Sequence, residues 1–179
     1  IYPEIKLRVS ISNTFGVESS LIGDLAQSGL IEGNTRNGLL EVSHVEFDQP
    51  VLVIANDKYQ TLNLPMSRTT IEQIPWIVRE SGSGTRAILG NLLETQKIKW
   101  NNINVALELP SNEAIRQAVE AGAGATIISK YVVDASIRNG ALTPIPLQIP
   151  KRSFQLVIQK DHEQTDAQRA FITFMRSAT

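Results

Sequence analysis

A run of glycines and hydroxyl side chains, Ser81-Gly82-Ser83-Gly84-Thr85, is the part of the chain best suited to hold a ligand. It follows a short apolar stretch that predicts a strand, and it precedes residues with helical spacing. Such a turn leaves backbone N–H groups unpaired at a helix N-terminus, where the helix dipole favours negative charge. Glycines let the backbone approach a ligand closely, and Arg86 adds a full positive charge or lies on the solvated helix face. The run therefore predicts a site for a small anion.

Other polar side chains follow predicted strands in the same way. In an open sheet of parallel strands, ligands bind outside the carboxyl ends of the strands. That rule selects further candidate contacts in four places: Ser111 and Asn112, Glu32 and Asn34, Asn13 and Thr14, and Ser129 and Lys130. Helix capping or turn formation is the alternative role of the hydroxyl and amide members, and helix capping is also the alternative for Ser81, Ser83 and Thr85.

The sequence lacks the residue patterns of common catalytic sites. It has no cysteine, which excludes disulfides, thiolate catalysis and Cys-based zinc sites. The glycine-rich run lacks the Gly-Lys-Ser/Thr ending of a phosphate loop, and no Gly-x-Ser-x-Gly elbow occurs. His44 and His162 are far apart and have no partner at metal-ligand spacing. We therefore expect no catalytic residue, no metal and no cofactor.

The composition fits a globular domain. The 179 residues are 42% apolar, which is ordinary for a soluble protein and enough for one full domain or two small lobes. The net charge is −1, and no run of Lys or Arg exceeds two residues, which argues against a nucleic-acid surface in this stretch. No apolar run approaches the roughly 20 residues needed to span a bilayer.

Hydrophobic periodicity predicts strands that alternate with helices. The predicted strands are 5–11, 29–31, 39–47, 51–55, 76–78, 105–109, 125–128 and 153–159, and the predicted helices are 17–26, 85–95, 112–121 and 131–138, with others starting near Thr69 and Thr165. This alternation implies right-handed crossovers and a mainly parallel sheet covered on both faces. We expect two lobes, residues 1–67 plus 146–179 and residues 68–145, with a hinge and a cleft between them.

Several segments, in order along the chain, resemble the effector-binding domain of LysR-type transcriptional regulators. They are 79–86 (RESGSGTR), 109–119 (LPSNEAIRQAV) and 121–129 (AGAGATIIS), and the segments 2–7 and 29–33 fit as well. The resemblance covers essentially the whole chain. The chain differs at Gln27, where many members of the family carry an Asp.

The resemblance implies an α/β, two-lobed periplasmic-binding-protein-like (type II) fold with mainly parallel sheets and an interlobe cleft. The effector would contact residues from both lobes: Ser81, Gly82, Ser83, Gly84, Thr85, Arg86, Ser111, Asn112, Glu32, Asn34, Asn13 and Thr14. It also implies a cytoplasmic bacterial regulator that forms a homodimer or homotetramer, without a membrane partner. DNA would be bound only through a winged helix-turn-helix that is absent from this stretch, as are the family's linker helix, first strand and the helix after it.

A periplasmic solute-binding protein for oxyanions is the alternative. Phosphate and molybdate carriers use similar Ser-Gly-Ser-Gly-Thr turns and the same two-lobed architecture. The sequence upstream would distinguish the two, because a helix-turn-helix there means a regulator and a signal peptide means a carrier.

Overall fold

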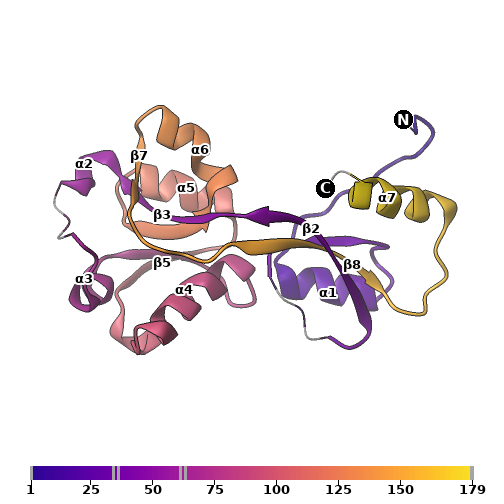
Figure 1. Cartoon of the computed structure of the whole chain (residues 1–179), viewed down its shortest axis with the longest axis horizontal. Helices are drawn as coiled ribbons and strands as arrows, with labels where there is room; N and C mark the ends of the chain where they lie inside the picture. The colour runs from indigo at the N-terminus through magenta and orange to yellow at the C-terminus, as the bar shows by residue number, and fades with distance from the viewer. Residues whose placement is uncertain (1, 34, 36, 61, 63, 178–179) are drawn as a thin grey trace. The chain divides into compact units, whose positions relative to one another are not determined.

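The computed structural model describes residues 2–33, 35, 37–60, 62 and 64–177. The chain divides into two compact units, the first formed by residues 1–47 and 153–179 and the second by residues 48–152 (Figure 1). The sequence placed these boundaries at 67 and 146 instead. The difference arises because strand β3 (Pro50–Ala55), expected in the first lobe, pairs only with strands of the second unit among the pairings described.

The second unit contains one five-stranded sheet with the strand order β5-β4-β6-β3-β7. Its other strands are β4 (Trp76–Arg79), β5 (Val105–Leu109), β6 (Ala125–Ser129) and β7 (Leu142–Ile145). Strand β4 is parallel to both β5 and β6, but β3 is antiparallel to both β6 and β7.

The expectation of mainly parallel sheets is therefore wrong, and the sheet is mixed. Strand β3 begins where β6 ends, because its first residue, Pro50, pairs with Ser129. It is therefore antiparallel to β6. Strand β7, which is not among the strands predicted from the sequence, then pairs with β3 from Leu142 to Ile145.

Helices cover both faces of this sheet. They are α2 (Asn56–Tyr59), α3 (Arg68–Gln73), α4 (Gly84–Thr95), α5 (Asn112–Glu120) and α6 (Lys130–Arg138), and a 3-10 turn spans Trp100–Asn102. Trp76 and Val78 of β4 lie in one apolar cluster with residues of α3 and α4, whereas Ile77 lies in another with residues of α5 and α6. This division follows from the alternation of side chains along a strand. The sequence predicted a helix start near Thr69, and α3 begins one residue earlier, at Arg68, with Ser67 as its cap.

The first unit contains a three-stranded sheet with the order β1-β8-β2. Its strands are β1 (Gly29–Ile31), β2 (Leu40–Asp48) and β8 (Arg152–Gln159), and its helices are α1 (Thr14–Ile22) and α7 (Asp166–Ser177). Val157 of β8 lies in a cluster with Leu21 of α1, while Leu156 lies in a cluster with Ile172 of α7. Neighbouring side chains of β8 thus enter separate small cores. Strands β2 and β8 reach the boundary with the second unit at Asp48 and Arg152.

The strand predicted for residues 5–11 is not formed. Its apolar side chains are exposed, with Leu7 at 71%, Val9 at 81% and Ile11 at 96%. Alternation of apolar and polar residues yields a strand only where another strand completes its hydrogen bonds and another layer covers its apolar face. No described strand pairs with this segment. Helix α1 also ends at Ile22 rather than at residue 26, which leaves Leu25 outside it.

Two leucines close together in sequence provide a test of this description of the first unit. Leu21 is fully buried, whereas Leu25 is 84% exposed. We expect Leu21→Ala to lower the free energy of unfolding by about 2–5 kcal/mol, because it removes apolar contacts and leaves a cavity. Leu25→Ala should change it by less than about 0.5 kcal/mol. Urea titrations followed by far-UV circular dichroism measure both, and equal losses would contradict this difference in burial.

Candidate binding site

Three helix N-termini meet the carboxyl ends of the three parallel strands. Strands β4, β5 and β6 run in the same direction, and each leads into a helix, α4, α5 and α6 respectively. A serine caps each helix: the Oγ atoms of Ser83, Ser111 and Ser129 accept hydrogen bonds from the backbone N–H groups of Thr85 (3.2 Å), Ala114 (3.1 Å) and Tyr131 (3.2 Å). This edge therefore gathers the positive ends of three helix dipoles.

The turn before α4 has the geometry that its glycines predict. Gly82 has a φ of 87°, in the left-handed region that side chains rarely adopt, and the N–H of Ser83 donates to the carbonyl of Glu80 (3.3 Å). Ser83 and Thr85 are buried, with 6% and 3% of their surface exposed, whereas Ser81 is exposed. The turn thus presents Ser81 to solvent and holds two further hydroxyl side chains beneath it.

Arg79, the last residue of β4, ties this turn to the start of α5. Its Nε and Nη2 donate to the two carboxylate oxygens of Glu80 (2.8 and 2.9 Å), and its Nη1 donates to Oδ1 of Asn112 (2.6 Å). The Arg79 side chain is only 9% exposed. The structure therefore brings two predicted groups together, the turn at 81–85 and the pair Ser111 and Asn112.

The sequence argument did not assign this role to Arg79. The available signal was a charged residue at the end of the apolar strand 76–78. A buried arginine at that place requires acceptors nearby, because an unpaired buried charge is costly.

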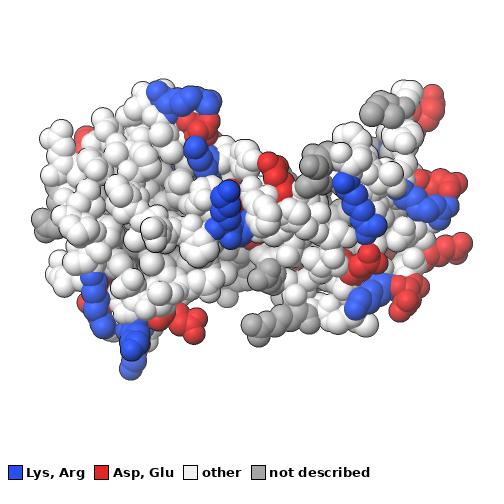
Figure 2. All heavy atoms as spheres, in the orientation of Figure 1, with Lys and Arg blue, Asp and Glu red and all other residues white. Residues whose placement is uncertain are grey.

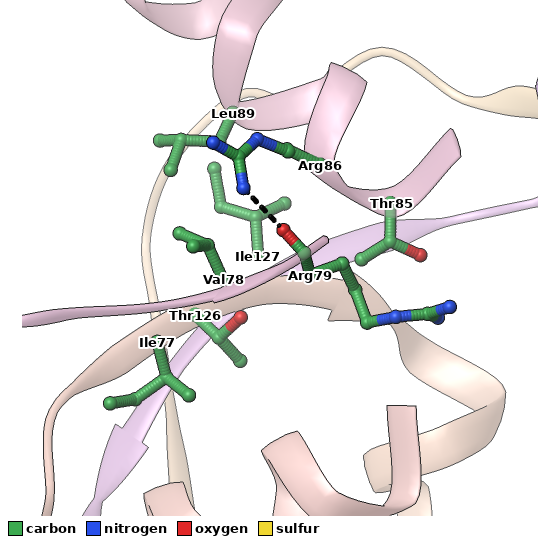
Figure 3. A pocket seen from close by; sticks show the side chains of 8 residues that line it. All are labelled: Ile77, Val78, Arg79, Thr85, Arg86, Leu89, Thr126 and Ile127. Carbon is green, nitrogen blue, oxygen red and sulfur yellow. Dashed lines mark hydrogen bonds between the residues drawn. The ribbon is translucent and has the colours of Figure 1, made fainter. Parts of the chain in front are cut away.

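Arg86 is held within the second unit. Its Nη1 donates to the carbonyl oxygen of Arg79 (2.7 Å) and to a carboxylate oxygen of Glu108, as Figure 3 shows for the first of these bonds. Its guanidinium carbon also lies 4.6 Å from the centroid of the Trp100 ring, a cation–π distance. Arg86 thus links α4 to the end of β4, to β5 and to the 3-10 turn.

A small depression lies behind the turn, between α4 and the sheet (Figure 3). Its lining comes from β4, β6 and α4: Ile77, Val78, Arg79, Thr85, Arg86, Leu89, Thr126 and Ile127. Four of these eight side chains are aliphatic, and the Arg86 guanidinium already has protein partners there. The depression is therefore less suited to an anion than the N-terminus of α4.

The four candidates of the first unit are placed differently. Asn13 caps α1, with its Oδ1 accepting from the N–H of Gly16 (2.9 Å), and Thr14 is the first residue of that helix. Glu32 follows β1 directly and is partly buried. Asn34 lies outside the described residues. Capping thus accounts for Asn13, whether or not it also contacts a ligand.

An ion-pair network lies along α5 and joins it to α6. Arg116 contacts the carboxylates of Glu113 and Glu120, and Ser136 of α6 donates to Glu120. The hydrogen bond from Arg116 is the main cause that lowers the pKa of Glu113, and the hydrogen bond to Glu113 raises the pKa of Arg116. Glu113, in the first turn of α5, is therefore largely neutralised by its neighbour.

The described residues form no cluster suited to a metal ion, and the face shown in Figure 2 carries charges of both signs. On the face shown in Figure 2, Lys and Arg side chains are interspersed with Asp and Glu. Among the described residues, no group of three or more histidines and carboxylates could hold a metal ion. Within the same residues, no helix has the length and apolar character needed to cross a membrane.

The chain belongs to the LysR substrate-binding domain family, whose model matches residues 2–179. This family consists of effector-binding regulatory domains of LysR-type transcriptional regulators, which are not enzymes. The α/β fold of this chain matches that of LysR regulatory domains, which are periplasmic-binding-protein-like. Family membership favours a regulator over the oxyanion carrier that the sequence left open.

Individual relatives agree with this assignment. The Escherichia coli K12 regulator YeiE, described as an uncharacterized helix-turn-helix regulator, is 26% identical over 97% of the chain, which spans 58% of YeiE. The Synechocystis CcmR regulatory domain in complex with 2-PG has a TM-score of 0.86 at 22% identity, over 99% of this chain and 85% of that one. The QuiR effector-binding domain in complex with shikimate has a TM-score of 0.78 at 16% identity, over 93% and 78%.

The buried position of Arg79 gives a second test. We expect Arg79→Gln to lower the free energy of unfolding by about 3 kcal/mol, since breaking a buried ion pair is strongly destabilising. The value is at the lower end of the range for buried pairs because the Glu80 side chain is 25% exposed. Arg138→Gln, which breaks an exposed pair with Asp134 on α6, should cost less than about 1 kcal/mol. Urea titrations followed by tryptophan fluorescence compare the two, and similar losses would show that Arg79 does not organise this edge.

The lowered pKa of Glu113 gives a third test. Because folding lowers this pKa, the associated stabilisation is complete above the ordinary value of 4.5 and is lost as the pH falls through the lowered value. We expect Glu113→Gln to flatten the acid side of the stability curve below about pH 5. Urea midpoints between pH 3 and 7 measure this, with Glu94→Gln at the exposed end of α4 as the control. A Glu113→Gln curve that matches the native one would contradict the interaction with Arg116.

Proposed function

We propose that this domain senses a small anionic effector, bound at the edge where β4, β5 and β6 end. The observation that carries the proposal is the convergence of three serine-capped helix N-termini on that edge, with Arg79 tying two of them together. Backbone N–H groups and helix dipoles there favour negative charge without requiring a free cationic side chain.

The turn at 81–85 is the proposed centre of the site. Ser81 is exposed and Gly82 lets the backbone approach a ligand, while Ser83, Gly84 and Thr85 form the start of α4. Ser111 and Asn112 extend the site toward α5. Arg86 is proposed to support the turn through Arg79 and Glu108, and it would reach an effector only by giving up these partners.

Similar domains support the proposed ligand class. The CcmR domain was solved with 2-PG and the QuiR domain with shikimate, and shikimate is a carboxylate. We infer that the effector of this domain carries a carboxylate or another oxyanion of comparable size. Asn13, Thr14, Glu32 and Asn34 stay candidate contacts from the first unit, on the sequence argument alone.

We further propose that the domain belongs to a longer cytoplasmic regulator that binds DNA through a helix-turn-helix and assembles as a homodimer or homotetramer. This follows the helix-turn-helix relative, of which the chain spans 58%. For sensing to control DNA binding, the effector must bind two states of the protein with different affinity. Such a difference requires a part of the domain that changes between the states.

A thermal-shift screen tests the proposal. The panel contains sulfate, phosphate, 2- to 7-carbon carboxylates and sugar phosphates, with neutral sugars of matched size as controls. An effector present at about 100 times its dissociation constant should stabilise the folded state by roughly 2.7 kcal/mol. For a domain of this size, that corresponds to an increase in the melting temperature of roughly 5–10 °C.

Variants of α4 then locate the ligand. We expect Ser83→Ala and Thr85→Ala to abolish the increase caused by the effector, because both hydroxyls lie at the helix N-terminus. Thr95→Ala, at the other end of α4 where Thr95 donates to the carbonyl of Asn91, should leave it intact. Each shift is compared with the same variant without ligand, since losing a cap alone costs about 1 kcal/mol. An increase that survives both N-terminal variants would place the ligand elsewhere.

A further inference from the structure

The chain passes between its two units twice, and charged residues border both crossings. The first crossing lies between Phe47 and Asp48, and the second between Arg152 and Ser153. Asp48 and Arg152 are 104 positions apart in sequence, yet Nε of Arg152 lies 2.7 Å from Oδ2 of Asp48. The Asp48 side chain is fully buried and that of Arg152 is 11% exposed. The two crossings are therefore joined to each other by a buried ion pair.

Ser129 adds a third member to this pair. Its Oγ donates to the other carboxylate oxygen of Asp48, Oδ1, at 2.6 Å, and the residue is 1% exposed. The same Oγ accepts the N–H of Tyr131 and so caps α6. Asp48 thus accepts from the second crossing with one oxygen and from the start of α6 with the other. Charge-assisted hydrogen bonds of this kind are short, strong and directional.

Gln49 makes a second connection one residue further on. The side-chain Nε2 of Gln49 donates to the backbone carbonyls of Ile149 (3.1 Å) and Pro50 (3.0 Å). The backbone carbonyl of Gln49 accepts the N–H of Lys130 (3.0 Å). The segment before the second crossing and the segment after the first are thus joined at two levels. Both levels also contact the N-terminus of α6.

We propose that Asp48, Arg152 and Ser129 form a clamp that fixes the direction in which both crossing strands leave the second unit. This inference goes beyond the proposed function, since it concerns the freedom of the crossings and not the effector. Hinges are formed by a few residues at the ends of elements, and a buried ion pair at both crossings restricts the backbone rotations available there. Removing one charge would leave the other buried without its partner, so the ion pair at the centre of the clamp is costly to break.

The clamp also connects the crossings to the edge that carries the proposed site. Ser129 caps α6, whose N-terminus is one of the three at that edge. The same side chain donates a hydrogen bond to the Asp48 carboxylate. A displacement of the start of α6 would therefore act on both crossings through the Ser129 hydroxyl and through the hydrogen bond from Lys130 to Gln49. Ser129 is a positioning residue in this scheme, because it acts through Asp48.

Distances between spin labels test the clamp directly. The chain has no cysteine, so Ser19→Cys on α1 and Asn91→Cys on α4 place one label at an exposed position in each unit. The comparison variant is Asp48→Asn with Arg152→Gln, which removes both charges together and leaves no lone buried charge. Glu72→Gln, which breaks an exposed pair with Arg68 on α3, is the matched control. Pulsed electron paramagnetic resonance measures the width of the distance distribution in each protein, without any effector.

We expect the double variant to show a broader distribution than the parent protein, and the Glu72→Gln control to match the parent. Amide hydrogen exchange at Lys130 should be faster in the double variant, because the backbone of Gln49 loses its anchor. A double variant that is folded by circular dichroism and keeps the parent width and exchange rate would overturn the proposal. If the double variant does not fold, Arg152→Lys takes its place, since a lysine keeps the charge but lacks Nε.

Ser129→Ala separates the third member of the clamp from the ion pair. We expect it to broaden the distribution less than the double variant does. A width equal to that of the parent would remove Ser129 from the clamp and contradict its role as a positioning residue. Because no effector is added, these outcomes are independent of the proposed binding site and of the ligand screen.

Discussion

The parallel pairing of β4 with β5 and with β6 is the constraint on which the candidate site depends. It brings the ends of three strands, and so the starts of α4, α5 and α6, to one edge of the sheet. Short turns then require caps for the exposed backbone N–H groups, and serine supplies them at residues 83, 111 and 129. Hydroxyl groups and helix dipoles are concentrated at this edge because of strand direction, before any ligand is considered.

Two buried arginines, Arg79 and Arg152, illustrate how the second unit uses charge. Each is almost inaccessible to solvent, and each donates to a carboxylate and so lowers the cost of its own burial. The remaining contacts differ: Arg79 joins two turns that end neighbouring strands, whereas Arg152 joins the two chain crossings. Exposed pairs such as Arg138 with Asp134 have weaker structural consequences, because water competes with them.

The sequence predicted local structure better than long-range arrangement. The bounds of β5 at 105–109 and β1 at 29–31 were correct, because their apolar runs end at turn residues, and β4 to α6 followed the expected alternation. The direction of β3 and the absence of a strand at 5–11 depend on partners elsewhere in the chain, which periodicity does not report. For the site, glycine and serine indicated the turn at 81–85. Arg79 had only a weak signal, and Asp48 with Arg152 had none, since their contact spans 104 positions.

The contact between Arg86 and Trp100 gives the second unit an intrinsic fluorescent probe. Both tryptophans of the chain, Trp76 and Trp100, belong to residues 48–152, so tryptophan fluorescence describes that unit alone. Trp76 is fully buried and senses its core, whereas the Trp100 ring lies under the guanidinium of a residue in the first turn of α4. The positive charge of Arg86, 4.6 Å from the ring centroid, interacts electrostatically with the indole of Trp100. The emission wavelength of Trp100 therefore depends on whether the Arg86 guanidinium keeps its position over the ring.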